Sequence, residues 1–236
     1  MAVLAATMCV SFTSCDDKEP NGGGDGNIQL AGKFQIEERV YNEETGETTY
    51  ITKDAPSGTV DEIEVRVGSG NYEDTSVIGT YSVNNINFSF TLPTPPAESL
   101  LSLAETFEFP EVTLSNEDAK YVSVHSFVPL KDGKQVGKLY IHPSEIFQLA
   151  NGKIELIEYF YSDRAVNIIG VYSTEDIYGD VTSRSIREYD VKLKKGWNVV
   201  IGIRTNTESE RLQTRTDKFF VLDAPSGNTM ASLQLN

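Results

Sequence analysis

The chain has 236 residues, of which 39% are hydrophobic and 23% charged, and its formal net charge at pH 7 is −15. This length suits one large or two small domains, and the composition is too rich in Ile, Val, Tyr and Phe for a disordered chain. The negative charge argues against nucleic acid as a partner, because that binding needs clustered Lys and Arg. The only cysteines are Cys9 and Cys15, so the remainder can hold no disulfide, thiolate metal site or cysteine nucleophile.

An apolar run with interspersed small residues occupies residues 3–12 and is followed by Thr13-Ser14-Cys15. About ten apolar residues are too few to span a bilayer, for which roughly 20 are needed, but they suit the centre of a secretory signal. We therefore expect residues 1–14 to be a signal peptide that is cleaved before Cys15. A buried N-terminal strand is the alternative interpretation of the same run.

The segment after the cleavage position is polar and rich in glycine. It carries Asp16, Asp17 and Glu19, and Gly, Asn and Asp dominate residues 21–27. Such a composition cannot pack into a core and behaves as a flexible linker. Residues 15–27 are therefore predicted to be an acidic, Gly-rich tether between Cys15 and a folded body.

From residue 28 onward, apolar and polar residues alternate with a period of two between turn residues, which is typical of half-buried strands. We predict strands at residues 32–41, 63–67, 77–92, 121–130, 137–142, 153–161, 165–173, 185–193, 197–205 and 218–222. Apolar residues at helical spacing predict one helix at 97–108, and a further helical turn is predicted at 143–150.

The predicted fold is all-β, with one or two antiparallel β-sandwich modules, immunoglobulin-like or transthyretin-like, and at most one or two short helices. A proline-rich stretch at residues 93–96 breaks the strand pattern and gives the preferred boundary. It separates an N-terminal module at residues 28–96 from a C-terminal module at residues 97–236.

Two turns are predicted to close hairpins. Asn84-Asn85 lies between strands at 79–83 and 86–92, and Lys194-Lys195-Gly196 lies between strands at 185–193 and 197–205. A three-residue loop that ends in glycine suits a hairpin with the glycine in the left-handed region. In the second hairpin, Trp197 belongs to the apolar face and is predicted to lie in the core, whereas Asn198 belongs to the polar face.

Three segments resemble uncharacterised lipoproteins of the Bacteroidales type: residues 77–93, 112–120 and 189–200. Phe12-Thr13-Ser14-Cys15 resembles the lipobox of bacterial lipoproteins, in which the cysteine receives a diacylglycerol. The acidic residues after Cys15 resemble the signal that exports such lipoproteins to the cell surface. The resemblance implies lipid attachment at Cys15, an outer-membrane location facing the exterior and β-sandwich modules. It implies no activity.

Few residues offer chemistry. The only histidines are His125 and His142, and no nucleophile elbow, zinc-protease motif, phosphate loop or dinucleotide fingerprint is present. Strand alternation predicts that His125 shares a face with Tyr121 and Phe127, opposite Val122 and Val124, as a structural or solvated residue. No catalytic residue, metal ligand or cofactor is predicted.

Acidic loops at residues 116–118 and 175–180 lack the alternating oxygen-ligand spacing of a calcium loop. Four tyrosines that cluster in sequence, Tyr159, Tyr161, Tyr172 and Tyr178, are the candidate ligand-binding residues, since exposed tyrosines can stack on sugar rings. The alternative is that they stabilise the sheet through cross-strand pairs.

These observations lead to a lipid-anchored binding or structural module with a glycan or protein ligand. The second hypothesis is a carboxylate-dependent glycan hydrolase, which needs only two facing carboxyl groups.

Overall fold

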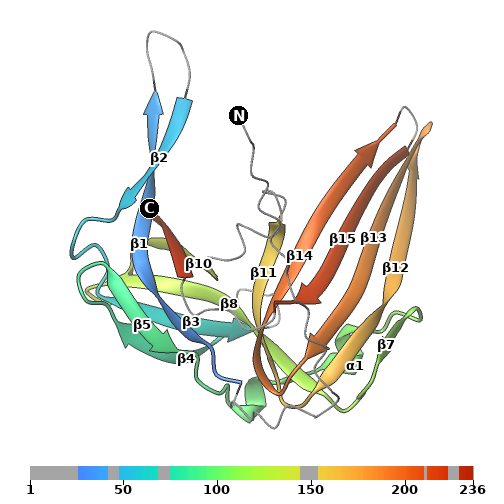
Figure 1. The fold of residues 1–236 in the computed structure, drawn as a ribbon, viewed down its shortest axis with the longest axis horizontal. Helices are drawn as coiled ribbons and strands as arrows, with labels where there is room; N and C mark the ends of the chain where they lie inside the picture. Colours follow the sequence, from blue (N-terminus) through green and yellow to red (C-terminus); the bar gives the residue numbers. More distant parts are fainter. Residues whose placement is uncertain are drawn as a thin grey trace, which may run out of the picture.

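Nearly every element of the computed structural model is a strand, which confirms the all-β prediction (Figure 1). The structure describes residues 26–41, 48–68, 75–143, 154–209, 212–222 and 229–235. Cys15, the predicted signal peptide and almost all of the predicted tether lie outside these ranges. The strands form one large open sheet with mixed pairing, because β1 and β16 are parallel, as are β13 and β15.

Nine of the strands within the described ranges form the body, the half of the molecule on the left in Figure 1. They are β1 (Gln29–Tyr41), β2 (Thr48–Asp54), β3 (Glu62–Gly68), β4 (Thr75–Ser82), β5 (Asn87–Thr91), β8 (Lys120–Lys131), β9 (Lys134–Gln135), β10 (Gly137–Pro143) and β16 (Thr229–Leu235). Strand β1 organises the body, since its first residues pair with β5 and its later residues pair with both β2 and β16. The strands thereby fold around one apolar core.

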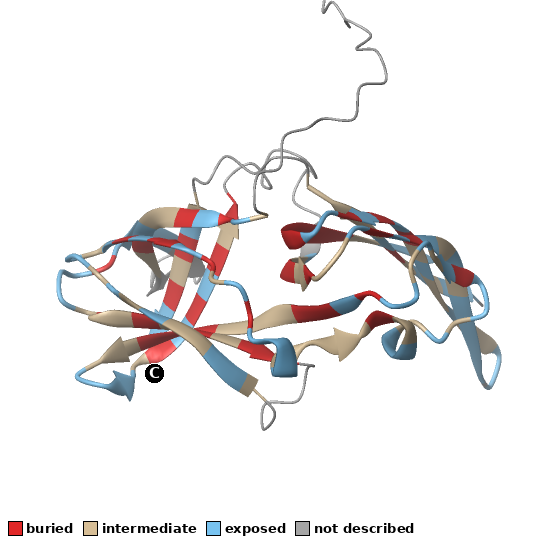
Figure 2. Ribbon diagram, turned by 90° about the horizontal axis from the view of Figure 1, so that it is seen from below, coloured by how far each residue is buried: buried red, intermediate tan, exposed pale blue. Residues whose placement is uncertain are grey.

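The other half of the molecule, the blade, is an elongated sheet. Its strands are β7 (Val112–Leu114), β11 (Ile154–Ser162), β12 (Val166–Tyr178), β13 (Val181–Leu193), β14 (Gly196–Glu208) and β15 (Leu212–Val221). Buried residues concentrate in the body and at the base of the blade, and the blade tip is exposed (Figure 2).

Two apolar clusters lie on opposite faces of the strands where the body meets the blade. On β11, Tyr159 belongs to the body cluster and its neighbour Phe160 belongs to the blade cluster; on β14, Val199 and Val200 divide in the same way. The face of β14 that was predicted to be polar is buried at the base of the strand, where Asn198 is 5% exposed and Val200 is 7% exposed. The amide of Asn198 is satisfied there by hydrogen bonds, since its Nδ2 donates to the carbonyls of Lys194 and Gly196. Trp197 is 5% exposed and its indole N–H donates to the carbonyl of Pro93 at 2.9 Å, which confirms its core position.

The two predicted hairpins do not form. Strand β15 lies between β13 and β14 in the sheet, so the strands on either side of Lys194-Lys195 do not pair with each other. Gly196 does have the positive φ expected of it, at 96°, and its Cα packs against Gly26 where no side chain would fit. At Asn84-Asn85 the chain turns, but β4 then pairs with β3 while β5 pairs with β1. Both turns therefore carry the chain between non-adjacent strands.

The helix predicted at residues 97–108 is broken into short pieces. A 3-10 turn, η1 (Ala97–Ser99), precedes β6 (Leu101–Ser102), which pairs with β8, and α1 (Leu103–Thr106) follows. The Ser102 hydroxyl accepts from the backbone N–H of Glu105 and starts α1 as an N-cap. Strand pairing at β6 thus overrides the helical spacing of the leucines. Residues 144–150 of the second predicted helical turn lie outside the described ranges.

Residues of the two predicted modules are joined directly within the sheet. Strand β3 pairs with β8, and β1 pairs with β16, across the proposed boundary at residues 96/97. The division into two modules stays a prediction. For the site, the consequence is that β8 and β10 from the second predicted module are built into the body.

Candidate functional site

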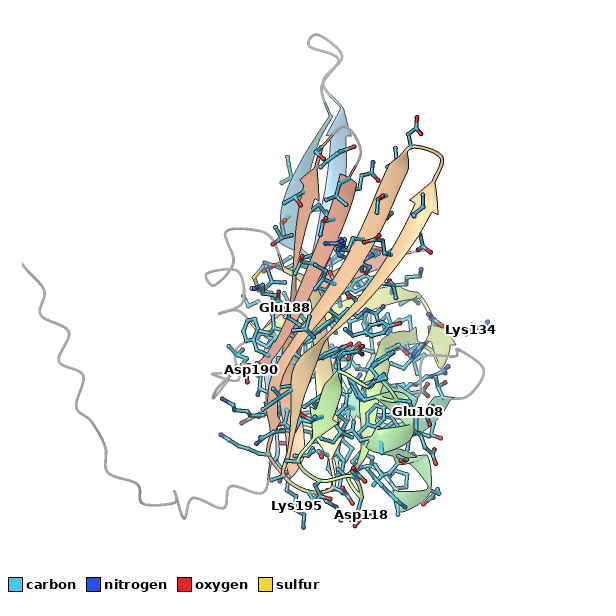
Figure 3. The ribbon with its side chains drawn as sticks, turned by 90° about the vertical axis from the view of Figure 1, so that its right-hand side faces the viewer. Glu108, Asp118, Lys134, Glu188, Asp190 and Lys195 are labelled. Carbon is cyan, nitrogen blue, oxygen red and sulfur yellow. The ribbon has the colours of Figure 1, made fainter. Side chains whose placement is uncertain are left out.

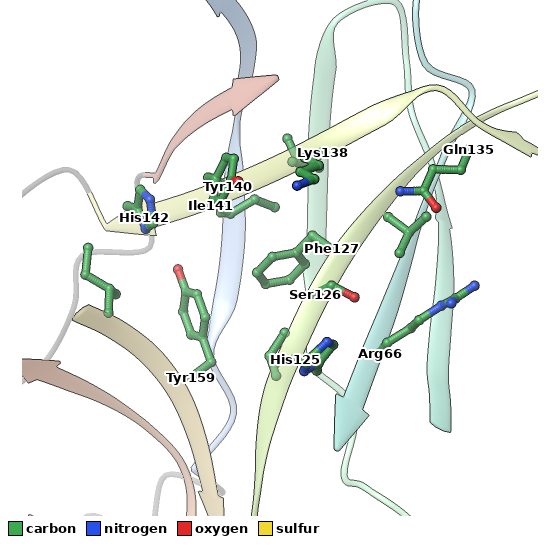
Figure 4. Close-up of a pocket in the computed structure, with 14 residues that line it drawn as sticks. Arg66, His125, Ser126, Phe127, Gln135, Lys138, Tyr140, Ile141, His142 and Tyr159 are labelled. Atoms are coloured by element: carbon green, nitrogen blue, oxygen red, sulfur yellow. The ribbon is translucent and has the colours of Figure 1, made fainter. Parts of the chain in front are cut away.

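A pocket of about 290 Å³ opens in the body where β8 and β10 separate (Figure 4). The two strands pair only at Leu139 and Phe127. Beyond this pair β10 continues beside β16, whereas β8 continues beside β11. The separation leaves room between them, and Tyr159 projects from β11 toward β10 and lines the pocket.

A β-bulge places His125 at one end of this pocket. Arg66 of β3 pairs with Ser126 of β8, but the next β3 residue pairs with Val124, so His125 is the extra residue. Bulges reverse the facing of the residues beyond them and are frequent beside functional sites. The predicted facing was therefore wrong: Phe127 lies in the same core as Val124 rather than on the opposite face.

The second histidine lines the same pocket. His142 and Tyr140 lie on one face of β10, with their ring centroids 6.4 Å apart. The Nδ1 atom of His142 is buried and has no hydrogen-bond partner among the described residues. Burial also lowers the pKa of His142, so the neutral imidazole is favoured. A neutral imidazole with an unused nitrogen can accept or donate one hydrogen bond to a ligand.

Charges of one sign line the pocket. Arg66 and Lys138 contribute cationic side chains, and no Asp or Glu is among the described lining residues, although the whole chain is strongly acidic. Arg66 also forms an ion pair with the carboxylate of Glu64, which offsets part of its charge. Tyr140 lines the pocket and is 41% exposed, so its side chain is accessible from solvent. Tyrosine, imidazole and cationic groups therefore converge on one concave surface.

The four candidate tyrosines do not form one row. Tyr159 is 3% exposed and packs edge-on against Phe127 at 5.7 Å, in the wall of the pocket. Tyr161 packs edge-on against Trp197. Tyr172 stacks on Phe109, at the blade cluster. The side chain of Tyr178 lies outside the described residues. Only Tyr159 reaches the pocket, and a ligand-binding role for the other three stays a prediction.

Carboxylates gather elsewhere. Glu188 and Asp190 project to the same side of the blade (Figure 3). Glu188 pairs with Lys218 at 2.6 Å, and Asp190 is largely exposed beside Lys192. In the part of the chain that the structure describes, no group of three or more His, Cys, Asp and Glu side chains is placed to hold a metal ion.

A scan against protein-family models and searches of curated proteins and of solved structures gave no match to this chain. Within the described ranges, no helix has the length and apolar character needed to cross a membrane.

Strand alternation alone does not bring the two histidines together. The bulge at His125 cannot be predicted from it, because nothing in the local pattern reveals an extra residue opposite β3. Tyr140 and Lys138 were also missed. The strict alternation of residues 137–143 could have indicated them, because it places Lys138, Tyr140 and His142 on one face of β10.

Proposed function

We propose that this protein is a lipid-anchored binding module whose pocket between β8 and β10 takes a glycan. The observation that carries the proposal is the convergence of Tyr140, Tyr159, both imidazoles and two cationic side chains on a pocket whose described lining includes no carboxylate. Aromatic rings can pack against sugar rings, and Arg and Lys recognise carboxylates. The chemistry therefore favours an acidic sugar unit.

The size of the pocket limits how much of a glycan enters it. A volume of about 290 Å³ is at the lower end for ligand sites, which usually span roughly 300 to 1,000 Å³. It suits one or two sugar units at a chain end or side branch. The alternative of a carboxylate-dependent hydrolase gains no support from this pocket, since that chemistry needs two facing carboxyl groups.

The proposed location rests on the sequence. Cleavage after residue 14 would leave Cys15 as the lipid-modified first residue, and the tether at residues 15–27 would hold the body near the outer membrane, facing the exterior. In membrane fractions, mass spectrometry is expected to find diacylated Cys15, and Cys15→Ala is expected to abolish processing. Unmodified Cys15 in a soluble fraction would overturn the anchor without affecting the proposed pocket.

The binding proposal is tested by calorimetry with short uronate-containing oligosaccharides and their neutral counterparts. We expect the acidic sugars to bind, and Tyr140→Ala and Lys138→Ala each to weaken binding by roughly tenfold, as loss of a stacked ring or a charge-assisted hydrogen bond does. Val77→Ala and Lys192→Ala are matched controls, since both side chains are exposed and outside the lining. Equal binding of acidic and neutral sugars, or equal effects of pocket and control variants, would contradict the proposal.

A further inference from the structure

A second cavity, of about 180 Å³, lies at the base of the blade on the side of the blade cluster. Strands β11 to β15 all contribute to its lining, and Phe107 closes it from the segment after α1. The lining is apolar except for the carboxyl group of Glu158 and the phenol of Tyr189. This cavity is separate from the pocket between β8 and β10, with which it shares no lining residue.

Glu158 is the unusual residue of this cavity. Strand alternation places it between Leu156 and Phe160, on the face of β11 that carries the blade cluster. The structure gives its carboxyl group no hydrogen bond or ion pair with any described residue. Burial raises the pKa of Glu158, because an apolar surround disfavours the charged form. The desolvation of such a carboxyl group costs free energy, which a hydrogen-bonding or cationic group of a bound ligand would offset.

The other titratable groups near Glu158 are already engaged. The Tyr121 hydroxyl lies 3.0 Å from the hydroxyl of Thr106, and the guanidinium of Arg187 favours the charged form of the Tyr189 phenol and so opposes the effect of burial on its pKa. Burial raises the pKa of both phenols, so they stay neutral near pH 7. Glu158 is therefore the group that would carry charge toward a ligand in this cavity.

The walls of the cavity suit a flat ring. Tyr189 stacks on Phe219 with ring centroids 5.1 Å apart and meets Phe107 edge-on at 5.4 Å. Aromatic rings favour these two arrangements with a further ring as well. For scale, an apolar cavity of about 150 Å³ can hold a benzene molecule. Leu156 is 37% exposed and lines the cavity, so the cavity reaches the surface beside it.

We propose that this cavity binds a small arylalkylamine, with one aromatic ring in the apolar part and a short chain that ends in an ammonium group. The ammonium donates a charge-assisted hydrogen bond to the Glu158 carboxylate, and the ring packs against Phe107, Tyr189 and Phe219. The volume admits one ring and a short chain. A neutral ring without the amine would leave the carboxyl group unpaired, and an anionic chain end would be repelled by it.

The test is calorimetric titration of the whole protein with phenethylamine at pH 7.5. Phenylacetate, of similar size and opposite charge, is the matched ligand control. We expect saturable binding of the amine and none of the acid. Glu158→Gln keeps the shape of the side chain but removes the charge, and is expected to weaken binding by at least about tenfold. Glu188→Gln is the matched variant control, because Glu188 is absent from this lining.

A second variant keeps the proposal falsifiable should the removal of Glu158 disturb the sheet. Leu156→Trp enlarges a partly exposed residue beside the opening and is expected to abolish binding while circular dichroism stays unchanged. The proposal is overturned if wild-type protein does not bind phenethylamine, if phenylacetate binds equally well, or if both variants bind as tightly as wild type. None of these results bears on glycan binding by the other pocket.

Discussion

The body and the blade are built from similar strands but bury their side chains differently. In the body, Phe34, Ile63 and Leu233 are at most 1% exposed, because strands surround them from several directions. At the blade tip, Ile177 is 72% exposed, and β12 and β13 continue as a paired ladder up to Tyr178 and Val181. Long strands are therefore not sufficient to bury side chains. A core forms only where the strands of the sheet surround one of its faces.

The difference implies an uneven distribution of stability. Regions with few buried apolar contacts open locally at low free-energy cost, whereas core strands open only with the whole molecule. The blade tip depends on ladder hydrogen bonds and on cross-strand pairs such as Arg184 with Glu175. Three predictions, each comparing substituted with wild-type protein, test this difference in stability.

The largest effect is expected in the body. Phe34 is 1% exposed and stacks on Phe88 with ring centroids 5.3 Å apart. Phe34→Ala removes this ring and leaves a cavity, which should lower the free energy of unfolding by about 3 to 5 kcal/mol in urea titration. Ile177→Ala at the blade tip is the control and should cost less than about 0.5 kcal/mol. Comparable costs at the two sites would refute the contrast.

An intermediate effect is expected at the base of the blade, and it should depend on pH. Because burial raises the pKa of Glu158, the folded protein keeps this proton where the unfolded chain has already lost it. Stability should therefore fall as the pH rises from the ordinary glutamate value of 4.5 through the raised pKa. Glu158→Gln should remove this loss, so its advantage over wild type should grow across that range and then level off. Thermal unfolding at a series of pH values measures it; a constant difference would argue against a buried carboxyl group.

The smallest effect is expected at the tip. Arg184 of β13 and Glu175 of β12 are opposite each other in the ladder. The Nη2 atom of Arg184 lies 2.7 Å from Oε2 of Glu175, and each side chain is 45% exposed. Exposed ion pairs contribute little, so Arg184→Ala should change the free energy of unfolding by less than about 0.5 kcal/mol, and less still in high salt. Hydrogen exchange is the better measurement, since local opening of the tip should increase. Loss of global stability above 1 kcal/mol would mean that the tip is part of the main cooperative unit.

The strands could largely be predicted because alternation is a local property of the chain. Each of the ten predicted strand segments overlaps an observed strand, and Trp197 lies in the core as its alternation indicates. Partners could not be predicted in the same way. The two hairpin predictions were wrong because a short turn does not guarantee that the strands it joins are neighbours in the sheet. In the second case, β15 from farther along the chain lies between β13 and β14.

The site was less accessible from sequence than the fold. Tyr159 was predicted as a ligand-binding candidate and lines the pocket, but the pocket exists because β8 and β10 separate and because a bulge displaces His125. Both are relations between distant strands. Strand β16 was missed for a related reason: only Ala231 and Leu233 are buried in it, too short a pattern to predict a strand.

The pairing of β16 with β1 also constrains how the protein can fold. The hydroxyl of Thr229 donates a hydrogen bond to the carbonyl of Ala31, 198 residues earlier in the chain. Leu233 of β16 and Phe34 of β1 belong to the same apolar core. Contacts of such wide separation close slowly, because the loop entropy is lost before the contact forms. The body therefore cannot close before β16 has been synthesised, and the part of β1 that pairs with β16 lacks this partner until then.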